Sequence, residues 1–139
     1  MNHNNIGDAE TIALAAALPT QLENLYLEYN KIRKKGAIAL ADALHRAPQL
    51  QTLNLGGNNI GDDGTIALAE ALSNSLQLQT LNLAYNKIGN YGAIALADAL
   101  HRAPQLHILD LFSNNIGEIG IKALKHRTRI QLNIRGIYI

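Results

Sequence analysis

The sequence predicts an α/β fold in which a short strand and a helix alternate along the chain. The expected arrangement is a right-handed β-α superhelix, a short solenoid with a parallel sheet on its concave side and helices outside. Two observations predict it. Leucine recurs every 28 residues at positions 22, 50, 78 and 106, and each opens the frame Leu-x-x-Leu-x-Leu-x-x-Asn-x-Ile. Each frame leads into residues with helical spacing, and such units bury their apolar faces only by stacking on neighbours.

The strand of each unit is predicted by the Leu-x-Leu at the centre of the frame. Apolar residues alternate there with variable ones, which is typical of a strand with one buried face. Complete units start at 22, 50, 78 and 106, and a partial unit at 1–21 carries Asn4 and Ile6 in the last frame positions. Extending the same period places a terminal strand at 134–139. The whole chain, 1–139, is therefore expected to form a single domain.

The helix of each unit is predicted by an apolar face with a period near 3.6 residues. The second unit shows the i, i+3, i+4 and i+7 spacing of such a face at Ala37, Leu40, Ala41 and Leu44. Asp8 and Asp62 fall where helix N-caps are expected. Pro48 and Pro104 follow the expected helix ends, where proline prevents continuation.

One asparagine in every frame is the polar exception among apolar residues. A buried amide requires hydrogen-bond partners, and this one can reach backbone groups of adjacent turns. The sequence therefore predicts a structural asparagine ladder, with no catalytic role, at Asn30, Asn58, Asn86 and Asn114.

The frame, followed by Gly-Ala-Ile-Ala-Leu-Ala-Asp-Ala-Leu at 36–44 and 92–100, resembles the leucine-rich repeats of the ribonuclease-inhibitor-like subfamily. That subfamily includes ribonuclease inhibitor, the repeat domains of NOD-like receptors and the Ran GTPase-activating proteins. The resemblance covers essentially the whole chain. It implies a horseshoe segment whose concave sheet binds proteins. The chain has no cysteine, whereas ribonuclease inhibitor is rich in cysteine, so the activity of that inhibitor is not expected.

Composition argues against several other classes of function. The net charge of +1 gives no strong attraction to nucleic acid or to an acidic membrane. With no cysteine, disulfides, thiolate metal sites and cysteine nucleophiles are excluded. The five histidines show no metal-ligand spacing, and no nucleophile-base-acid pattern is present. We therefore expect no enzyme activity, no cofactor and no metal.

The beginning of the chain is polar, and the longest apolar run, at 12–18, is too short to span a bilayer. A cytoplasmic protein is the expectation.

The frame also determines which residues can face a partner. Variable positions beside the strand leucines point away from the core, and aromatic residues among them are typical of interfaces. A Tyr/Glu cluster lies near one end, and Ile108 and Phe112 are expected to flank Asp110 near the other. The alternative is that these are scattered exposed side chains. The predicted partner-binding residues are Tyr26, Glu28, Tyr29, Asn54, Asn82, Tyr85, Ile108, Asp110 and Phe112.

A basic run occupies 31–35, and at 33–35 the other units carry acidic or neutral residues. Positive charge is unfavourable at a helix N-terminus. The run is either a contact for an acidic partner or a change that a surface loop tolerates.

The leading functional hypothesis is a protein-protein interaction module that binds its partner through the concave sheet face. One alternative, taken from the resemblance, is a GTPase-activating protein of the Ran-directed type. Another is a structural fragment of a longer repeat protein. Because both ends of the chain fall inside repeats, self-association through uncapped repeat ends is also expected.

Overall fold

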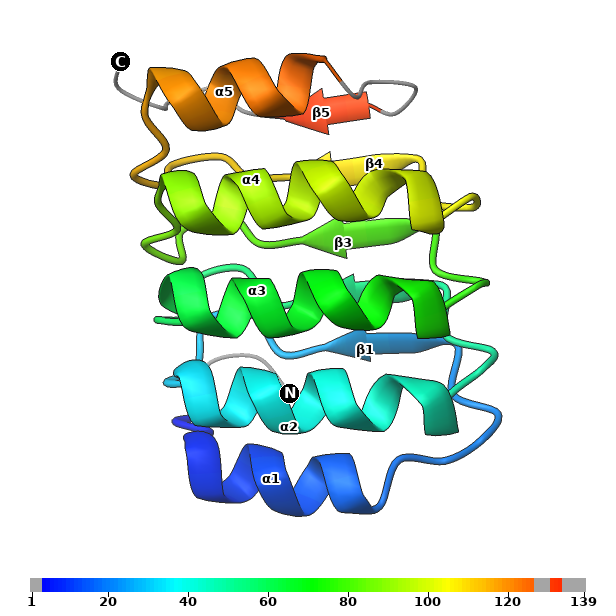
Figure 1. Ribbon diagram of the computed structural model, residues 1–139. Helices are drawn as coiled ribbons and strands as arrows, with labels where there is room; N and C mark the ends of the chain where they lie inside the picture. Colours follow the sequence, from blue (N-terminus) through cyan, green and yellow to red (C-terminus); the bar gives the residue numbers. More distant parts are fainter. Residues whose placement is uncertain (1–3, 127–130, 134–139) are drawn as a thin grey trace.

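The computed structural model shows strand-helix units stacked along one axis, with the helices in one layer and the strands in another (Figure 1). It describes residues 4–126 and 131–133. The helices are α1 (Asp8–Ala16), α2 (Lys34–Ala43), α3 (Gly61–Ala71), α4 (Asn90–Ala99) and α5 (Glu118–Lys125). Short 3-10 helices follow three of them: η1 (Leu44–Arg46), η2 (Leu72–Asn74) and η3 (Leu100–Arg102). The strands are β1 (Asn24–Tyr26), β2 (Thr52–Asn54), β3 (Thr80–Asn82), β4 (Ile108–Asp110) and β5 (Gln131–Asn133).

The strands form one parallel sheet whose order follows the chain, β1-β2-β3-β4-β5. From β1 to β4, each residue pairs with the residue 28 positions later, as Leu53 does with Leu81. This register places equivalent side chains of successive units beside one another. The predicted α/β solenoid with a parallel sheet is confirmed.

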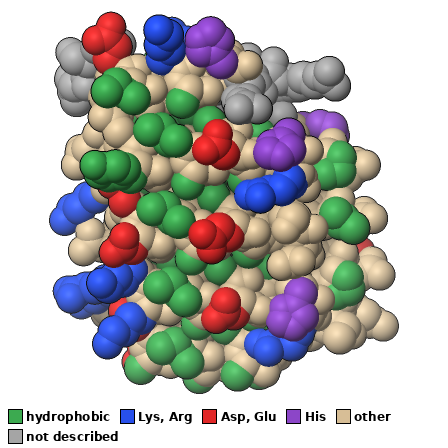
Figure 2. Space-filling view, in the orientation of Figure 1, with side chains coloured by type: hydrophobic (Ala, Val, Ile, Leu, Met, Phe, Trp, Pro, Cys, Tyr) green, Lys and Arg blue, Asp and Glu red, His purple; other side chains and the backbone are tan. Residues whose placement is uncertain are grey.

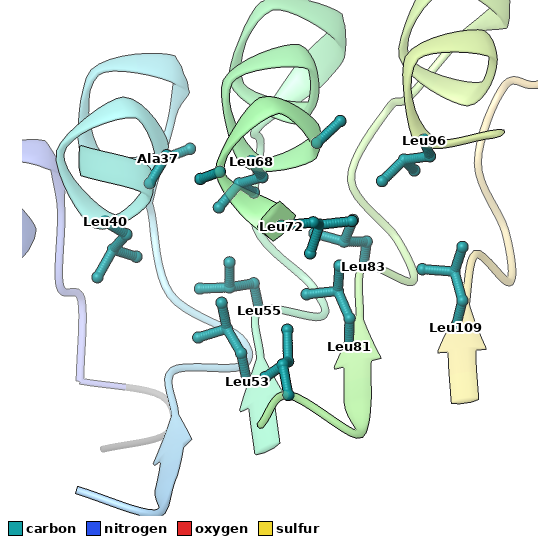
Figure 3. Packing of buried hydrophobic residues seen from close by; sticks show 14 of the residues in the cluster. Ala37, Leu40, Leu53, Leu55, Leu68, Leu72, Leu81, Leu83, Leu96 and Leu109 are labelled. Carbon is teal, nitrogen blue, oxygen red and sulfur yellow. The ribbon is translucent and has the colours of Figure 1, made fainter. Parts of the chain in front are cut away.

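The core lies between the two layers and consists of leucine, isoleucine and alanine. Strand leucines such as Leu53 and Leu81 meet helix leucines such as Leu68 and Leu96 there (Figure 3). The predicted helix face is confirmed, because all four of its residues are buried: Ala37, Leu40, Ala41 and Leu44. Burying one leucine contributes about 1.5–3 kcal/mol, so each added unit gains stability mainly from this layer.

The frame asparagines connect each unit to the unit before it. Asn86, which is fully buried, accepts a hydrogen bond at Oδ1 from the Ile60 N–H (3.3 Å). Its Nδ2 donates to the carbonyl oxygens of Leu55 (2.8 Å) and Ala84 (3.0 Å). Asn114 Oδ1 in turn accepts from the Asn86 N–H at 2.9 Å. Equivalent hydrogen bonds are made throughout the ladder, by Asn30, Asn58, Asn86 and Asn114.

The helix caps differ from the sequence prediction. Asp8 and Asp62 lie inside the first turns of α1 and α3, and neither caps its own helix. Asp8 Oδ1 instead accepts from the backbone N–H groups of Arg33 (2.8 Å) and Gly36 (2.9 Å), at the start of the next helix. Asp62 and Asn90 make the same pair of hydrogen bonds to α4 and α5. Each cap therefore acts on the next unit, because a side chain in the first turn of one helix lies beside the start of the following helix.

Lys34 interrupts this series of caps. It occupies the position equivalent to Asp8, Asp62 and Asn90, and its ammonium group cannot accept a hydrogen bond. The Gly61 N–H donates instead to the carbonyl oxygen of Asn86 (2.9 Å), and Gly61 has a φ of +67°. Lys34 Nζ lies 3.8 Å from a carboxylate oxygen of Asp63, and both side chains are largely exposed.

The terminal strand predicted at 134–139 falls outside the described residues, and the last strand that the structure describes is β5. It occupies Gln131–Asn133 and pairs Leu109 with Leu132, which lies 23 residues later instead of 28. The helix before it, α5, has 8 residues, against 10 or 11 in α2, α3 and α4. The chain therefore returns to the sheet earlier than the period predicts.

No helix in the described ranges has both the length and the apolar composition needed to cross a membrane.

We expect Asn86→Ala to lower the free energy of unfolding by about 3 kcal/mol, because buried backbone groups lose their partners. The control is Asn115→Ala, since Asn115 is exposed beside the ladder and its loss should change stability by less than about 0.5 kcal/mol. Urea denaturation of both variants measures the difference. Similar losses in the two variants would contradict the ladder.

We expect Lys34→Asn to raise the free energy of unfolding by about 1 kcal/mol, because it supplies the missing cap of α3. Lys35→Asn removes the same charge one residue away and should change stability by less than about 0.5 kcal/mol. Thermal and urea unfolding measure both. If Lys34→Asn gives no gain over Lys35→Asn, capping between units does not contribute to stability as described.

Candidate functional site

A hollow lies on the face of the sheet that points away from the helices, where the turns leave the strands. We call it the sheet hollow. It is lined by Glu28, Tyr29, Asn54, Gly56, Asn82, Ala84, Tyr85, Asp110, Phe112 and Asn133. These residues lie on the strands β2 to β5 or in the turns that follow β1 to β4, so the stacking register determines the shape of the hollow.

The side chains at the ends of the central strands are held by their own backbone. Asn82 Oδ1 accepts from the Ala84 N–H at 2.9 Å, and Asn54 does the same with Gly56 at 3.1 Å. Asp110 Oδ1 accepts from the backbone N–H two residues later at 2.9 Å. These hydrogen bonds use Oδ1 of each side chain, whereas Nδ2 of the two asparagines and Oδ2 of Asp110 take no part in them. The side chains at the centre of the floor are thus small, uncharged and held in place.

One turn position beside the hollow has left-handed backbone in four successive units. The φ angles are +56° at Tyr29, +69° at Gly57, +55° at Tyr85 and +55° at Ser113. Glycine adopts this conformation freely, whereas a residue with a side chain pays about 1–2 kcal/mol. The two tyrosines therefore occupy a position where backbone energy favours glycine.

The tyrosine rings rest on the neighbouring unit. A Cβ built on Gly57 would lie 2.5 Å from the Tyr29 ring, so that ring covers the backbone of the next turn. The Tyr85 ring meets the Phe112 ring edge-on, with centroids 5.4 Å apart and planes inclined by 67°. Edge-to-face pairs of this kind are favourable. About half of each tyrosine side chain stays exposed toward solvent.

The structure brings most of the predicted partner-binding residues into the sheet hollow. These are Glu28, Tyr29, Asn54, Asn82, Tyr85, Asp110 and Phe112. Tyr26 and Ile108 are exposed on β1 and β4 but do not line it. Sequence reasoning missed Asn133, because the 28-residue period places the next strand at 134–139, which lies outside the described residues. The available signal was Gln131-Leu132-Asn133, which repeats the polar-Leu-Asn pattern of β2 and β3.

The charges at the hollow are of one sign. Glu28 and Asp110 are the charged residues among those that line it, and both are acidic. Within the described part of the chain, no three histidine or carboxylate side chains gather in a way that could hold a metal ion. The arrangement offers aromatic surface, amide groups and carboxylates, which are groups that recognise another molecule by contact.

The helix face offers a different surface. Acidic, basic and hydrophobic side chains are interspersed over it (Figure 2). A depression between α2 and α3 is lined by residues that include Ile38, Asp42, His45 and Glu70, with no phenylalanine, tyrosine or tryptophan among them. The sheet hollow, with its three rings, is therefore the stronger candidate for a binding site.

Comparison with known families gives one match. A family model described as leucine rich repeat matches residues 20–41, 48–69, 75–97 and 104–125. Each match includes one strand and most or all of the helix after it. The narrower ribonuclease-inhibitor-like assignment stays a prediction. None of the curated proteins matches the chain in sequence.

Several solved structures share the fold. Leiomodin-1, in a structure titled actin-binding site 2, is 20% identical with a TM-score of 0.77, over 91% of this chain and 78% of that one. A protein of Bacteroides fragilis is 14% identical with a TM-score of 0.54, over 84% of this chain and 42% of that one. An internalin of Listeria monocytogenes is 24% identical with a TM-score of 0.47, over 82% and 35%. At these identities the likeness to the first two shows the fold alone.

We expect Gly57→Ala to lower the free energy of unfolding by about 3 kcal/mol, since the new Cβ meets the Tyr29 ring in a left-handed turn. Gly61→Ala is the control, because Gly61 has a similar φ of +67° but no atom within 4 Å of the added Cβ. It should cost only about 1–2 kcal/mol. In a Tyr29→Ala background the excess cost of Gly57→Ala should disappear. An excess that persists there would show that the ring does not rest on Gly57.

Proposed function

We propose that this chain, which belongs to the leucine-rich repeat family, binds another protein through the concave strand side of its sheet, at the sheet hollow. The observation that carries the proposal is the pair of tyrosines, Tyr29 and Tyr85, held in left-handed turns with their rings half exposed.

Backbone energy does not favour tyrosine at these turns, although each ring also packs on the neighbouring unit. Gly57 shows that glycine fits the equivalent position in the same stack. Strained backbone of this kind is found mostly at functional sites, where the side chain itself is needed. Exposed tyrosines are also among the residues that contribute most to protein interfaces.

The surroundings of the tyrosines support a macromolecular partner. The hollow extends from Tyr29, just after β1, to Asn133 on β5. Gly56 and Ala84 have little or no side chain and leave the centre of its floor low, so a segment of another protein can lie across the strands. Rings at the rim with a neutral, hydrogen-bonding floor match the usual composition of protein interfaces.

The structural relatives support the same class of partner without identifying it. The leiomodin-1 structure with this fold is titled as an actin-binding site. A stack of similar size therefore occurs in a segment that binds a protein. Because the likeness extends to the fold alone, the partner of this chain has to be found by experiment.

We expect Tyr85→Ala and Phe112→Ala each to weaken partner binding at least about tenfold, the effect of removing an interface hot spot. The partner is first captured from a cell lysate on the immobilised chain, and its affinity is then measured by titration. Tyr91→Ala is the matched control, because Tyr91 lies on α4 with 77% of its side chain exposed.

The control should bind as the unchanged chain does, and all three variants should unfold cooperatively. Equal losses in the control, or full affinity in both hollow variants, would contradict binding at the sheet hollow.

A further inference from the structure

The chemistry of the sheet hollow is more specific than a general protein-binding surface. Its described lining contains two carboxylates and three aromatic rings, and no lysine or arginine. A surface of this kind attracts a cation, because the carboxylate supplies the charge and the ring face adds a favourable quadrupole.

We propose that the hollow binds an arginine side chain of the partner, at Asp110 beside the rings of Tyr85 and Phe112. This inference rests on the proposed function and names the chemistry that the partner must present.

The three side chains are held together by contacts within the stack. Asp110 Oδ1 accepts from the Phe112 N–H at 2.9 Å, which fixes the carboxylate next to the phenylalanine. The Phe112 ring is fixed in turn by its edge-on contact with Tyr85, with centroids 5.4 Å apart. Asp110 Oδ2 takes no part in the hydrogen bond to Phe112 and is the atom that we assign to the guanidinium. The carboxylate is thus oriented before any partner arrives, which reduces the entropy lost on binding.

The shape of the site favours arginine over lysine. A guanidinium is planar, so one face can lie on a ring while its edge donates to a carboxylate. It is also less strongly hydrated than an ammonium, so it loses less on entering a half-buried site. Asp110 and Phe112 are both half-buried, which suits a flat group better than a hydrated point charge.

The rest of the hollow suits the chain that carries the arginine. Gly56 and Ala84 have little or no side chain, so a partner backbone can approach the sheet there. Asn54 and Asn82 use Oδ1 in their hydrogen bonds to the backbone, so their Nδ2 groups can donate to peptide carbonyl oxygens of the partner. Glu28, at the far end of the hollow, adds a second negative charge. The expected ligand is an extended segment with an arginine near one end and few acidic residues.

The test is a selection from a random twelve-residue peptide library displayed on phage, with the full chain immobilised. Asp110→Asn removes the charge and keeps an Oδ1 that accepts from the Phe112 N–H, so the fold should not change. Asp42→Asn is the matched control, because it removes one exposed carboxylate from α2 on the helix face.

We expect the selected peptides to be enriched in arginine relative to both lysine and the starting library. Asp110→Asn should reduce their binding by about tenfold, which corresponds to one charge-assisted contact, and Asp42→Asn should leave it unchanged. A synthetic copy of the most enriched peptide with citrulline in place of arginine, which keeps the shape without the charge, should show a similar loss.

Other results separate this inference from the proposed function. Peptides that lose binding with Tyr85→Ala but show no preference for arginine, or no loss with Asp110→Asn, would overturn the arginine site and leave hollow binding in place. Peptides that bind Tyr85→Ala and Asp110→Asn as tightly as the unchanged chain would overturn binding at the hollow as well. Selection of acidic peptides, or of none, would overturn the arginine site.

Discussion

The asparagine ladder is the constraint on which the rest of this structure depends. A strand of three residues and a helix of about three turns cannot form a core alone, so the units have to be held in one register. Asn58, Asn86 and Asn114 do this by binding backbone groups of their own turn and of the preceding unit. Because these amides are buried, a shift in stacking would leave polar groups without partners. The aligned leucines of the core and the aligned side chains of the hollow both follow from that register.

The helix caps add a second connection between units. Asp8, Asp62 and Asn90 each satisfy the backbone at the start of the following helix. A unit without its neighbour therefore has an incomplete helix as well as an exposed core. This dependence is the physical reason why such arrays are stable only as stacks. Lys34 is the exception: it provides no cap, and the Gly61 N–H donates to the carbonyl oxygen of Asn86 instead.

Much of the fold could be predicted from the sequence, because a fixed spacing of residues indicates that the same contacts recur in each unit. The solenoid, the parallel register and the buried helix faces all follow from the spacing of leucine and alanine. The caps could not be assigned correctly, because a pattern read within one unit does not show that Asp8 acts on the next. The strand at Gln131–Asn133 could not be predicted from the 28-residue period, because it follows a helix that is shorter than the others. At the hollow, the sequence identified the exposed residues, but the left-handed turns and the contact of Tyr85 with Phe112 depend on backbone geometry that spacing does not record.

The frame accounts for nearly every residue that it repeats, and many of the residues that vary between units line the sheet hollow. We propose that the partner lies there. The chain has no cysteine, so a single Asn82→Cys or Tyr91→Cys variant can carry one photoactivated cross-linker at a known place. We predict that the partner is cross-linked from position 82 and not from position 91. Cross-linking from position 91 alone would contradict it.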